Sequence, residues 1–591
     1  MAFLELGQHS AQSGVVLFDF CVASGRLRSP YGQQSVLFMK KSVGILSGLA
    51  IAIAVATTAG AWYTGKQLPA ELDNALARSN AELKKALVST GGSMSIERVS
   101  LEQHLFSSTA QYRLKARDIN VGQGEVINFD VGVTDQIEHG PFPWSRVRAL
   151  KLMPVMAVSN STLQKDEAVA PLFAAAGEKA PISAQTSLGY GGSVVSQVQL
   201  APLKIDEADG NTFDFSGMQF EVSGDKEGKA SKFRGQADRL VMKRVHDDQP
   251  PATFELKGLT FGGNLAATAH DAIYVGNVDL ALAEAKVTLG PKQQVLLIKG
   301  LEQNALQTLD GTDTVGGRAA YKVGDISWDG RAVGKAQMAV SVTSVNAPAL
   351  QALSKWYQSH LPEFEAASAA GQPVPQIQMD DAEKARFQGD LQKLLAAKPK
   401  LAVENLSFKT ANGESRFNLS MDLAAPASFD LPPDQLSKQI ITEVKGKLSL
   451  SKPMIGDLAT LQALLDGQTD AQAIAMQSSQ AGEMVGMMAL QSGMATVQGD
   501  DVVSSLHYAD GMVDFNGRKM TVEEFAMFMA AHLAACRRRG DGFSCCSLFA
   551  GEPAPTRISP CRSGFTREEA STGNTKTPLV IAGLSVAFGL R

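Results

Sequence analysis

Alternation of apolar with polar or small residues recurs along much of this chain. Four clear examples, each bounded by Gly, Asn or Asp, are VINFDVGVTD (126–135), FDFSGMQFEVSG (213–224), NVDLALAEAKVTLG (277–290) and QMAVSVTSV (337–345). Successive side chains of a β-strand point to opposite faces, so this spacing predicts strands with one apolar face. Because these segments follow one another at short intervals without helical patterns between them, we predict a mainly antiparallel sheet over 91–345.

Helical spacing interrupts this pattern later in the chain. The segments 346–371 and 380–398 have it, which predicts a helical insertion over 346–400. The rest of the body, 401–535, is predicted to combine strands, Met-rich helices and a terminal hairpin. In the Met-rich zone, core packing and an adaptable binding surface are equally good interpretations. The expected fold class is therefore α+β.

A run of 22 residues without charge, Ser42–Tyr63, follows Lys40 and Lys41. As a helix it would be about 33 Å long, enough for a hydrocarbon core of about 30 Å. The two lysines favour the cytoplasmic side, and Trp62 and Tyr63 favour the outer membrane–water interface. We therefore predict a single transmembrane anchor over 39–65 and a juxtamembrane helix over 66–90.

Cleavage of this segment is the alternative, because Ala59-Gly60-Ala61 fits the small-x-small rule for a secretory signal. A retained anchor is favoured, because the apolar run exceeds the roughly 7 to 15 residues of a signal core.

The cysteines divide the chain sharply. All five lie at Cys21, Cys536, Cys545, Cys546 and Cys561, and none lies between 39 and 535. A cysteine-free body suits an oxidising compartment. The break also favours the hypothesis that 1–38 is a non-native N-terminal extension and 536–591 a read-through tail.

Charge and motifs exclude several classes of function. A net charge of -5, from 55 basic and 60 acidic residues, gives no reason to expect a nucleic-acid partner. The chain has no G-x-S-x-G, no Walker-type loop and no H-E-x-x-H. We accordingly assign no catalytic residue, no cofactor and no metal ligand.

One predicted loop contains a histidine that is a candidate functional residue. His139 is followed by Gly140, Pro141, Phe142 and Pro143. A functional interpretation makes His139 an acid/base or a ligand. The favoured interpretation is a histidine that hydrogen-bonds and pins a rigid turn, with Phe142 as a core residue, because no nucleophile or carboxylate partner is identifiable at a useful spacing. The nearby acidic residues Asp135 and Glu138 are expected to be solvated in a turn.

The body resembles the YdgA/YihF-like family of Gram-negative bacterial proteins. The resemblance is carried by AWYTGKQL after the anchor, HLFSST (104–109), IEHGPFPW (137–144), NGESRFNLS (412–420) and HYADGMVDFNGRKMTVEEF (507–525). It implies an inner-membrane protein with its bulk in the periplasm, and it brings no known reaction, cofactor or catalytic residue. The layout is also similar to that of the AsmA-like group, which implies a curved sheet with an apolar groove.

The leading hypothesis is a non-enzymatic envelope protein, anchored in the bacterial inner membrane with its N-terminus in the cytoplasm and its body in the periplasm. It would bind an apolar, lipid-like ligand or an envelope protein. The alternatives are an envelope hydrolase that uses His139 and a homo-oligomeric scaffold paired through the juxtamembrane helix.

Overall fold

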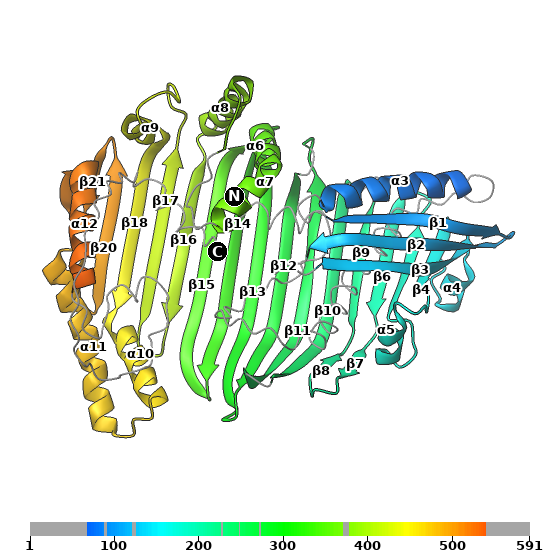
Figure 1. Ribbon diagram of the computed structural model, residues 1–591, viewed down its shortest axis with the longest axis horizontal. Coiled ribbons are helices and arrows are strands. Elements are labelled where there is room, and N and C mark those ends of the chain that lie inside the picture. Colours follow the sequence, from blue (N-terminus) through cyan, green and yellow to red (C-terminus); the bar gives the residue numbers. More distant parts are fainter. Residues whose placement is uncertain are drawn as a thin grey trace, which may run out of the picture.

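The fold is one long antiparallel sheet, flanked by helices. The computed structural model describes residues 68–87, 92–120, 126–225, 229–246, 249–270, 273–369 and 377–538. Within these residues, 22 strands belong to a single sheet, and every pairing between neighbouring strands is antiparallel. Figure 1 shows a broad curved sheet whose N-terminal strands fold over at one end.

The strands are β1 Ser93–Gln103, β2 Ser107–Asn120, β3 Val126–His139, β4 Ala157–Leu163, β5 Ile182–Leu188, β6 Ser193–Leu200, β7 Leu203–Asp206, β8 Thr212–Phe215, β9 Met218–Asp225, β10 Ala230–His246, β11 Gln249–Ala267, β12 Tyr274–Leu289, β13 Gln294–Asp310, β14 Thr314–Trp328, β15 Arg331–Asn346, β16 Lys400–Lys409, β17 Glu414–Leu423, β18 Ile441–Ser451, β19 Thr496–Gln498, β20 Asp501–Ala509, β21 Met512–Phe515 and β22 Arg518–Thr521.

The helices are α3 Leu68–Ala86, α4 Trp144–Arg148, α5 Ala170–Ala175, α6 Ala347–Ser359, α7 Leu361–Ala369, α8 Asp381–Ala396, α9 Pro433–Ile440, α10 Lys452–Leu465, α11 Ala471–Ser492 and α12 Val522–Arg538. In Figure 1, α3 lies along β1, α8 and α9 lie at one rim of the sheet, and α12 lies at its C-terminal end.

Strand order follows the sequence almost throughout. Strands β1 to β6 pair in succession, β6 pairs with β9, and β9 to β18 pair in succession, before β20, β21 and β22 complete the sheet. The hairpin of β7 and β8 pairs with β10, and β19 pairs with β20. This near-meander keeps most connections short.

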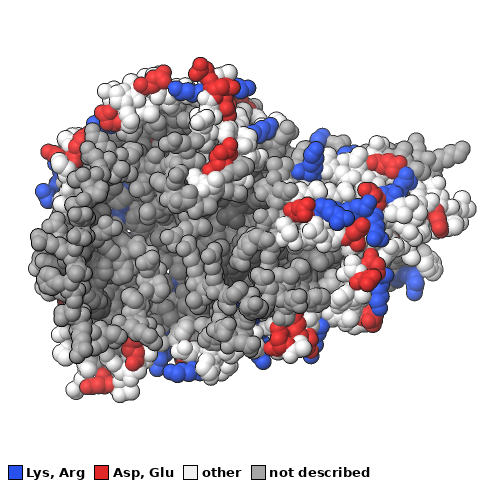
Figure 2. All heavy atoms as spheres, viewed as in Figure 1, with Lys and Arg blue, Asp and Glu red and all other residues white. Residues whose placement is uncertain are grey.

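The main hydrophobic core lies at the N-terminal end. There β1 to β6, β8 and β9 pack around a large buried cluster together with α3 and α5, with Val131, Ile137 and Val198 fully buried. The opposite face of β1 to β3 is charged, with ion pairs such as Lys115 to Glu97 at 2.7 Å. Figure 2 shows acidic and basic side chains interspersed over this part of the molecule.

A second, smaller core closes the C-terminal end, where Phe515 of β21 packs against Phe525 and Phe528 of α12. Between the two ends, few apolar side chains of the sheet are buried. On strands β13 to β18 the buried apolar side chains are Ala319, Ala339 and Val345. The middle of the sheet therefore lacks the packed interior that both ends possess.

The predicted large, mainly antiparallel sheet with helices is confirmed, and it is an open sheet. The expected absence of helices between the early strands was wrong, because α4 and α5 interrupt that region. Both are at most six residues long, too short to show a helical period. The segments 1–38 and 39–65 and the tail from 539 onward lie outside the described residues.

Helix α3 covers the outer edge of β1. Asn80 accepts a hydrogen bond from the Ile96 amide at 2.8 Å and donates one to the Ile96 carbonyl oxygen at 3.0 Å. Among the described strands β1 pairs with β2 alone, so Asn80 satisfies two backbone groups that the sheet leaves open.

Replacing Asn80 with Ala should therefore loosen the docking of α3 on β1. We expect a local loss of about 1–3 kcal/mol, measured as faster hydrogen exchange at the Ile96 amide, because both backbone groups lose their partner. Asn74→Ala, at an exposed position of the same helix, is the matched control and should leave this exchange unchanged. Equal exchange in the two variants would contradict the assigned role.

Candidate functional site

The most extensive candidate site is one face of the sheet. Directly opposite residues on antiparallel strands carry their side chains on the same face. One such row crosses eight strands, from β12 to β20, and we call its side of the sheet the apolar face. Its members are Val278, Ala305, Ala319, Val340, Val403, Leu419, Gly446 and Leu506.

The neighbouring rows on the apolar face are also dominated by apolar residues. One contains Tyr321, Met338, Leu406, Phe417 and Leu448. These side chains are only partly buried, and Leu406 is 44% exposed. None of the described helices packs extensively on β11 to β14. At about 4.8 Å per strand, the eight-strand row is about 34 Å long.

The opposite face is polar and carries the ion pairs of the central strands. On this face, the row next to that of Val278 and Leu506 consists of Asn277, Leu306, Arg318, Ser341, Ala402, Ser420, Lys445 and His507. Arg318 pairs with Glu404 at 2.8 Å and Lys322 with Glu302 at 3.1 Å. Charge is thus concentrated on one face, and apolar area on the other.

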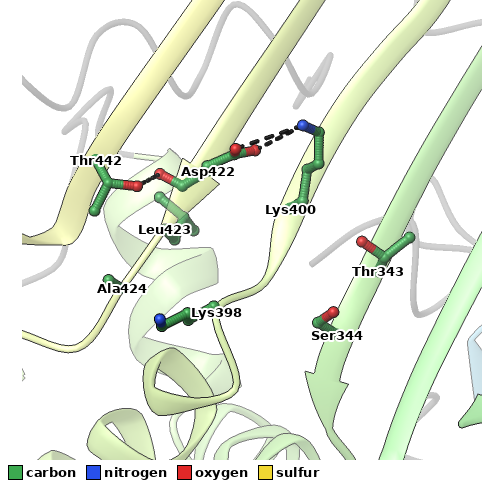
Figure 3. Close-up of a pocket in the computed structure, with 8 residues that line it drawn as sticks. All are labelled: Thr343, Ser344, Lys398, Lys400, Asp422, Leu423, Ala424 and Thr442. Carbon is green, nitrogen blue, oxygen red and sulfur yellow. Dashed lines mark hydrogen bonds and ion pairs between the residues drawn. The ribbon is translucent and has the colours of Figure 1, made fainter. Parts of the chain in front are cut away.

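A pocket of about 490 Å³ opens at the ends of the strands (Figure 3). It is lined by Thr343, Ser344, Lys398, Lys400, Asp422, Leu423, Ala424 and Thr442. The Lys400 ammonium lies 3.1 Å from an Asp422 carboxylate oxygen, and the Thr442 hydroxyl donates to the Asp422 backbone carbonyl at 3.0 Å. Lys400 and Asp422 neutralise each other, and no histidine lines the pocket. This arrangement offers no nucleophile–base pair.

His139 is the last residue of β3 and joins two connections at one end of the sheet. The His139 amide donates to the Phe106 carbonyl oxygen at 2.9 Å, and the ring Nδ1 lies 3.4 Å from the Leu105 carbonyl oxygen. Because a carbonyl oxygen only accepts, Nδ1 carries the proton, and in the neutral ring Nε2 accepts from the Ser108 hydroxyl at 3.0 Å. His139 therefore ties the β1–β2 turn to the β3–β4 connection.

Ser108 is a partner that the sequence analysis missed, and a serine beside a histidine suggests a nucleophile and its base. Ser108 is however 1% exposed, so a substrate has no access to its hydroxyl. Asp135 does not orient the ring, because its carboxylate accepts hydrogen bonds from Ser159 and Ser161 of β4. The geometry fits a structural tie better than a catalytic pair.

Two expectations for this loop were wrong. Phe142 is not a core residue, because it is 58% exposed. Asp135 is not a solvated turn residue, because it lies on β3 and is fully buried. Gly140 and Pro141 are held by backbone contacts, with the Gly140 amide donating to the Met156 carbonyl oxygen at 2.7 Å, and Pro143 is buried at the start of α4.

Asp135 is the most perturbed carboxyl of this region. Burial raises its pKa to about 6, and hydrogen bonds from Ser159 at 2.7 Å and Ser161 at 3.2 Å counteract part of the rise. Tyr112, on the adjacent strand β2, has its own pKa raised, first by burial and then by the Asp135 charge.

The Met-rich zone is described by the structure, whereas the predicted anchor is not. On α11, Met476, Met484, Met487 and Met488 are exposed, so core packing does not account for the Met-rich zone. Lys40, Lys41, Trp62 and Tyr63 lie outside the described residues. Within the described residues, no helix is both long and apolar enough to cross a membrane, and no cluster of three or more His, Cys, Asp or Glu residues is placed to hold a metal ion.

These features define a large open-sheet protein without a recognisable catalytic centre in its described part. The chain belongs to a bacterial family described as "Bacterial protein of unknown function (DUF945)", which matches residues 39–523. This confirms the resemblance to the YdgA/YihF-like family.

Two relatives come from Escherichia coli K12. "Protein YdgA" is 28% identical over 505 residues, which cover 83% of this chain and 97% of that protein. "Uncharacterized protein YihF" is 23% identical over 497 residues, covering 81% and 97%. An uncharacterized protein of Haemophilus influenzae is 23% identical over 321 residues, covering 53% and 85%. No solved structure matches the chain.

The buried carboxyl predicts how stability depends on pH. Because the folded-state pKa of Asp135 lies above its unfolded value, the protonated form favours folding, and this contribution is lost as pH rises from about 4 to about 6. Asp135→Asn should raise the free energy of unfolding above about pH 6 by on the order of 2–3 kcal/mol and change it little near pH 4.

Denaturant unfolding of the variant and the wild type at several pH values measures this difference. Asp130→Asn, at a half-exposed position of the same strand, is the control. A benefit of Asp135→Asn that does not vary with pH would contradict the assignment.

Proposed function

We propose that this protein is a single-pass envelope protein of the bacterial inner membrane, and that its periplasmic body binds an apolar, lipid-like ligand on the apolar face. The observation that carries the proposal is the row of eight apolar or glycine residues that runs uninterrupted from β12 to β20. On this account the curved sheet forms an apolar groove.

Acyl chains fit the chemistry of this face. The defining row offers Val, Leu, Ala and Gly, which carry no side-chain hydrogen-bonding group, and its backbone groups belong to the antiparallel ladders. A ligand there gains affinity from removal of apolar area from water, at about 25 cal/mol per Å². Protein interfaces, by contrast, are enriched in aromatic residues and arginine and carry about one hydrogen bond per 100–200 Å². A lipid is therefore the better occupant.

The proposed location is supported by the sequence. The uncharged run Ser42–Tyr63 has the length of a membrane span, and Lys40 and Lys41 give it the orientation of a protein whose body is exported. The cysteine-free body is compatible with an oxidising periplasm.

Two leucines with nearly equal exposure provide a matched test of ligand binding. Leu406 is 44% exposed on the apolar face, between Met338 and Phe417, and Leu306 is 48% exposed on the polar face, between Asn277 and Arg318. Leu406→Gln should lower the lipid retained per molecule of purified full-length protein by about threefold or more, because it places a polar amide on the binding surface.

Leu306→Gln is the control and should retain the wild-type amount. The wild type and both variants carry the same anchor and therefore the same anchor-bound lipid. The readout is the difference between the variants in lipid retained per molecule, measured by quantitative mass spectrometry. Equal thermal unfolding midpoints establish that both variants are folded. Equal lipid retention in folded Leu406→Gln and Leu306→Gln proteins would overturn the proposal.

A further inference from the structure

Large apolar side chains are exposed together at one end of the molecule. Because neighbouring strands are antiparallel, the β1–β2, β3–β4 and β5–β6 connections meet at the same end of the sheet. These connections carry eight exposed apolar residues, which we call the loop-end patch: Leu105, Phe106, Phe142, Trp144, Leu150, Leu152, Met153 and Tyr190. Leu105 is 82% exposed and Met153 is 79% exposed. Single exposed apolar residues are ordinary, but a cluster of this size marks an interaction surface.

Hydrogen bonds hold the three connections together as one surface. His139 binds the backbone of the β1–β2 turn, as described above, and the Met156 amide donates to the Leu188 carbonyl oxygen at 2.7 Å, which joins the β3–β4 and β5–β6 connections. The Arg146 guanidinium contacts the Met153 carbonyl oxygen at 3.4 Å. The patch is thus presented by a tied set of loops.

The charges in these connections are basic. Between His139 and Ala157 the charged residues are Arg146, Arg148 and Lys151, without an acidic residue among them. The nearest acidic residues in the sequence are Glu102 and Glu138, at the ends of strands. Glu138 accepts a hydrogen bond from the Ser145 amide at 2.7 Å. Apolar rings and aliphatic chains interspersed with Arg and Lys are suited to an anionic lipid interface, where Trp and Tyr also prefer to lie.

The direction of α3 brings the proposed anchor to the same end. Asn80 contacts Ile96, and Asp73, earlier in the helix, pairs with Arg98, later in the strand, at 2.8 Å. Helix and strand are therefore antiparallel, and Leu68, about 18 Å before Asn80 along the helix, lies toward the end of β1 that leads into Leu105. In Figure 1, α3 and β1 lie side by side, and α4 lies at the same end of the sheet as the β1–β2 turn.

Little chain separates this end from the uncharged run. Tyr63 precedes Leu68 by five residues, a span of at most about 18 Å. A bilayer that holds the anchor must therefore pass close to the end of the molecule that carries the loop-end patch.

We infer that the loop-end patch docks onto the surface of the bilayer that holds the anchor, with Phe142 and Trp144 in the interfacial region and the exposed Arg148 and Lys151 against anionic headgroups. This rests on the proposed anchor and adds a second membrane contact to it. The two contacts fix the orientation of the body relative to the membrane.

Fluorescence quenching by brominated lipid tests the contact in the full-length protein. The chain has four tryptophans, Trp62, Trp144, Trp328 and Trp356. In vesicles of brominated phosphatidylcholine and phosphatidylglycerol, W144F should lose about a third to a half of the quenchable emission, because Trp144 lies at the depth of the headgroups. W356F should lose little of it, since Trp356 packs against Phe387 on the α6–α8 helices.

The same experiment separates failure of the patch from failure of the anchor. W62F reports on the anchor. If W62F lowers quenching and W144F does not, the anchor stands and docking of the patch is overturned. If Trp144 is shielded from brominated lipid and a photoreactive residue at Phe142 captures a protein in cell envelopes, the patch binds protein and the inference is likewise overturned.

Charge reversal provides a second readout. The double variant Arg148→Glu and Lys151→Glu should reduce quenching of Trp144 in phosphatidylglycerol-containing vesicles by about twofold or more and change it little in phosphatidylcholine alone. The control, Lys384→Glu and Arg386→Glu, makes the same charge change at exposed positions of α8 and should have no such effect. An equal response of both double variants would contradict a role for the basic residues of the patch.

Discussion

Cross-strand register is the constraint on which the rest of this structure depends. Strand side chains have a period of two, so a slip of one residue would exchange the two faces of a strand. From β12 to β20 the register places Val, Leu, Ala and Gly opposite one another in one row and polar residues such as Arg318, Ser341 and Lys445 in the next. The segregation of apolar and charged area over eight strands follows from that register.

The distribution of the core follows from how each end of the sheet is covered. At the N-terminal end the sheet folds over and encloses Val131, Ile137 and Val198, and at the C-terminal end α12 packs on Phe515. Between them most side chains of the apolar face are only partly buried, although Val278 and Ala319 are buried. On the proposed account the buried ends of the sheet stabilise the fold, and the partly buried apolar face between them binds lipid. The loop-end patch fixes the orientation of the body relative to the membrane.

The sequence predicted the type of fold well because alternation is a local signal. Segments such as 277–290 and 337–345 are strands of one antiparallel sheet, and the family is confirmed. The continuity of the apolar face was not predictable, since it depends on which residues lie opposite one another in distant strands. The Ser108–His139 contact and the exposure of Phe142 could not be predicted from the sequence either, because both depend on how separate connections pack together.

The central claim is that one face of the sheet contacts lipid and the other does not. A photoreactive amino acid placed in turn at positions 338 to 342 of β15, in the full-length protein in cell envelopes, tests it most directly. The account predicts lipid adducts at Met338, Val340 and Val342 and few at Ala339 and Ser341, following the period of the strand. Lipid adducts without this alternation, or none at Val340, would contradict it.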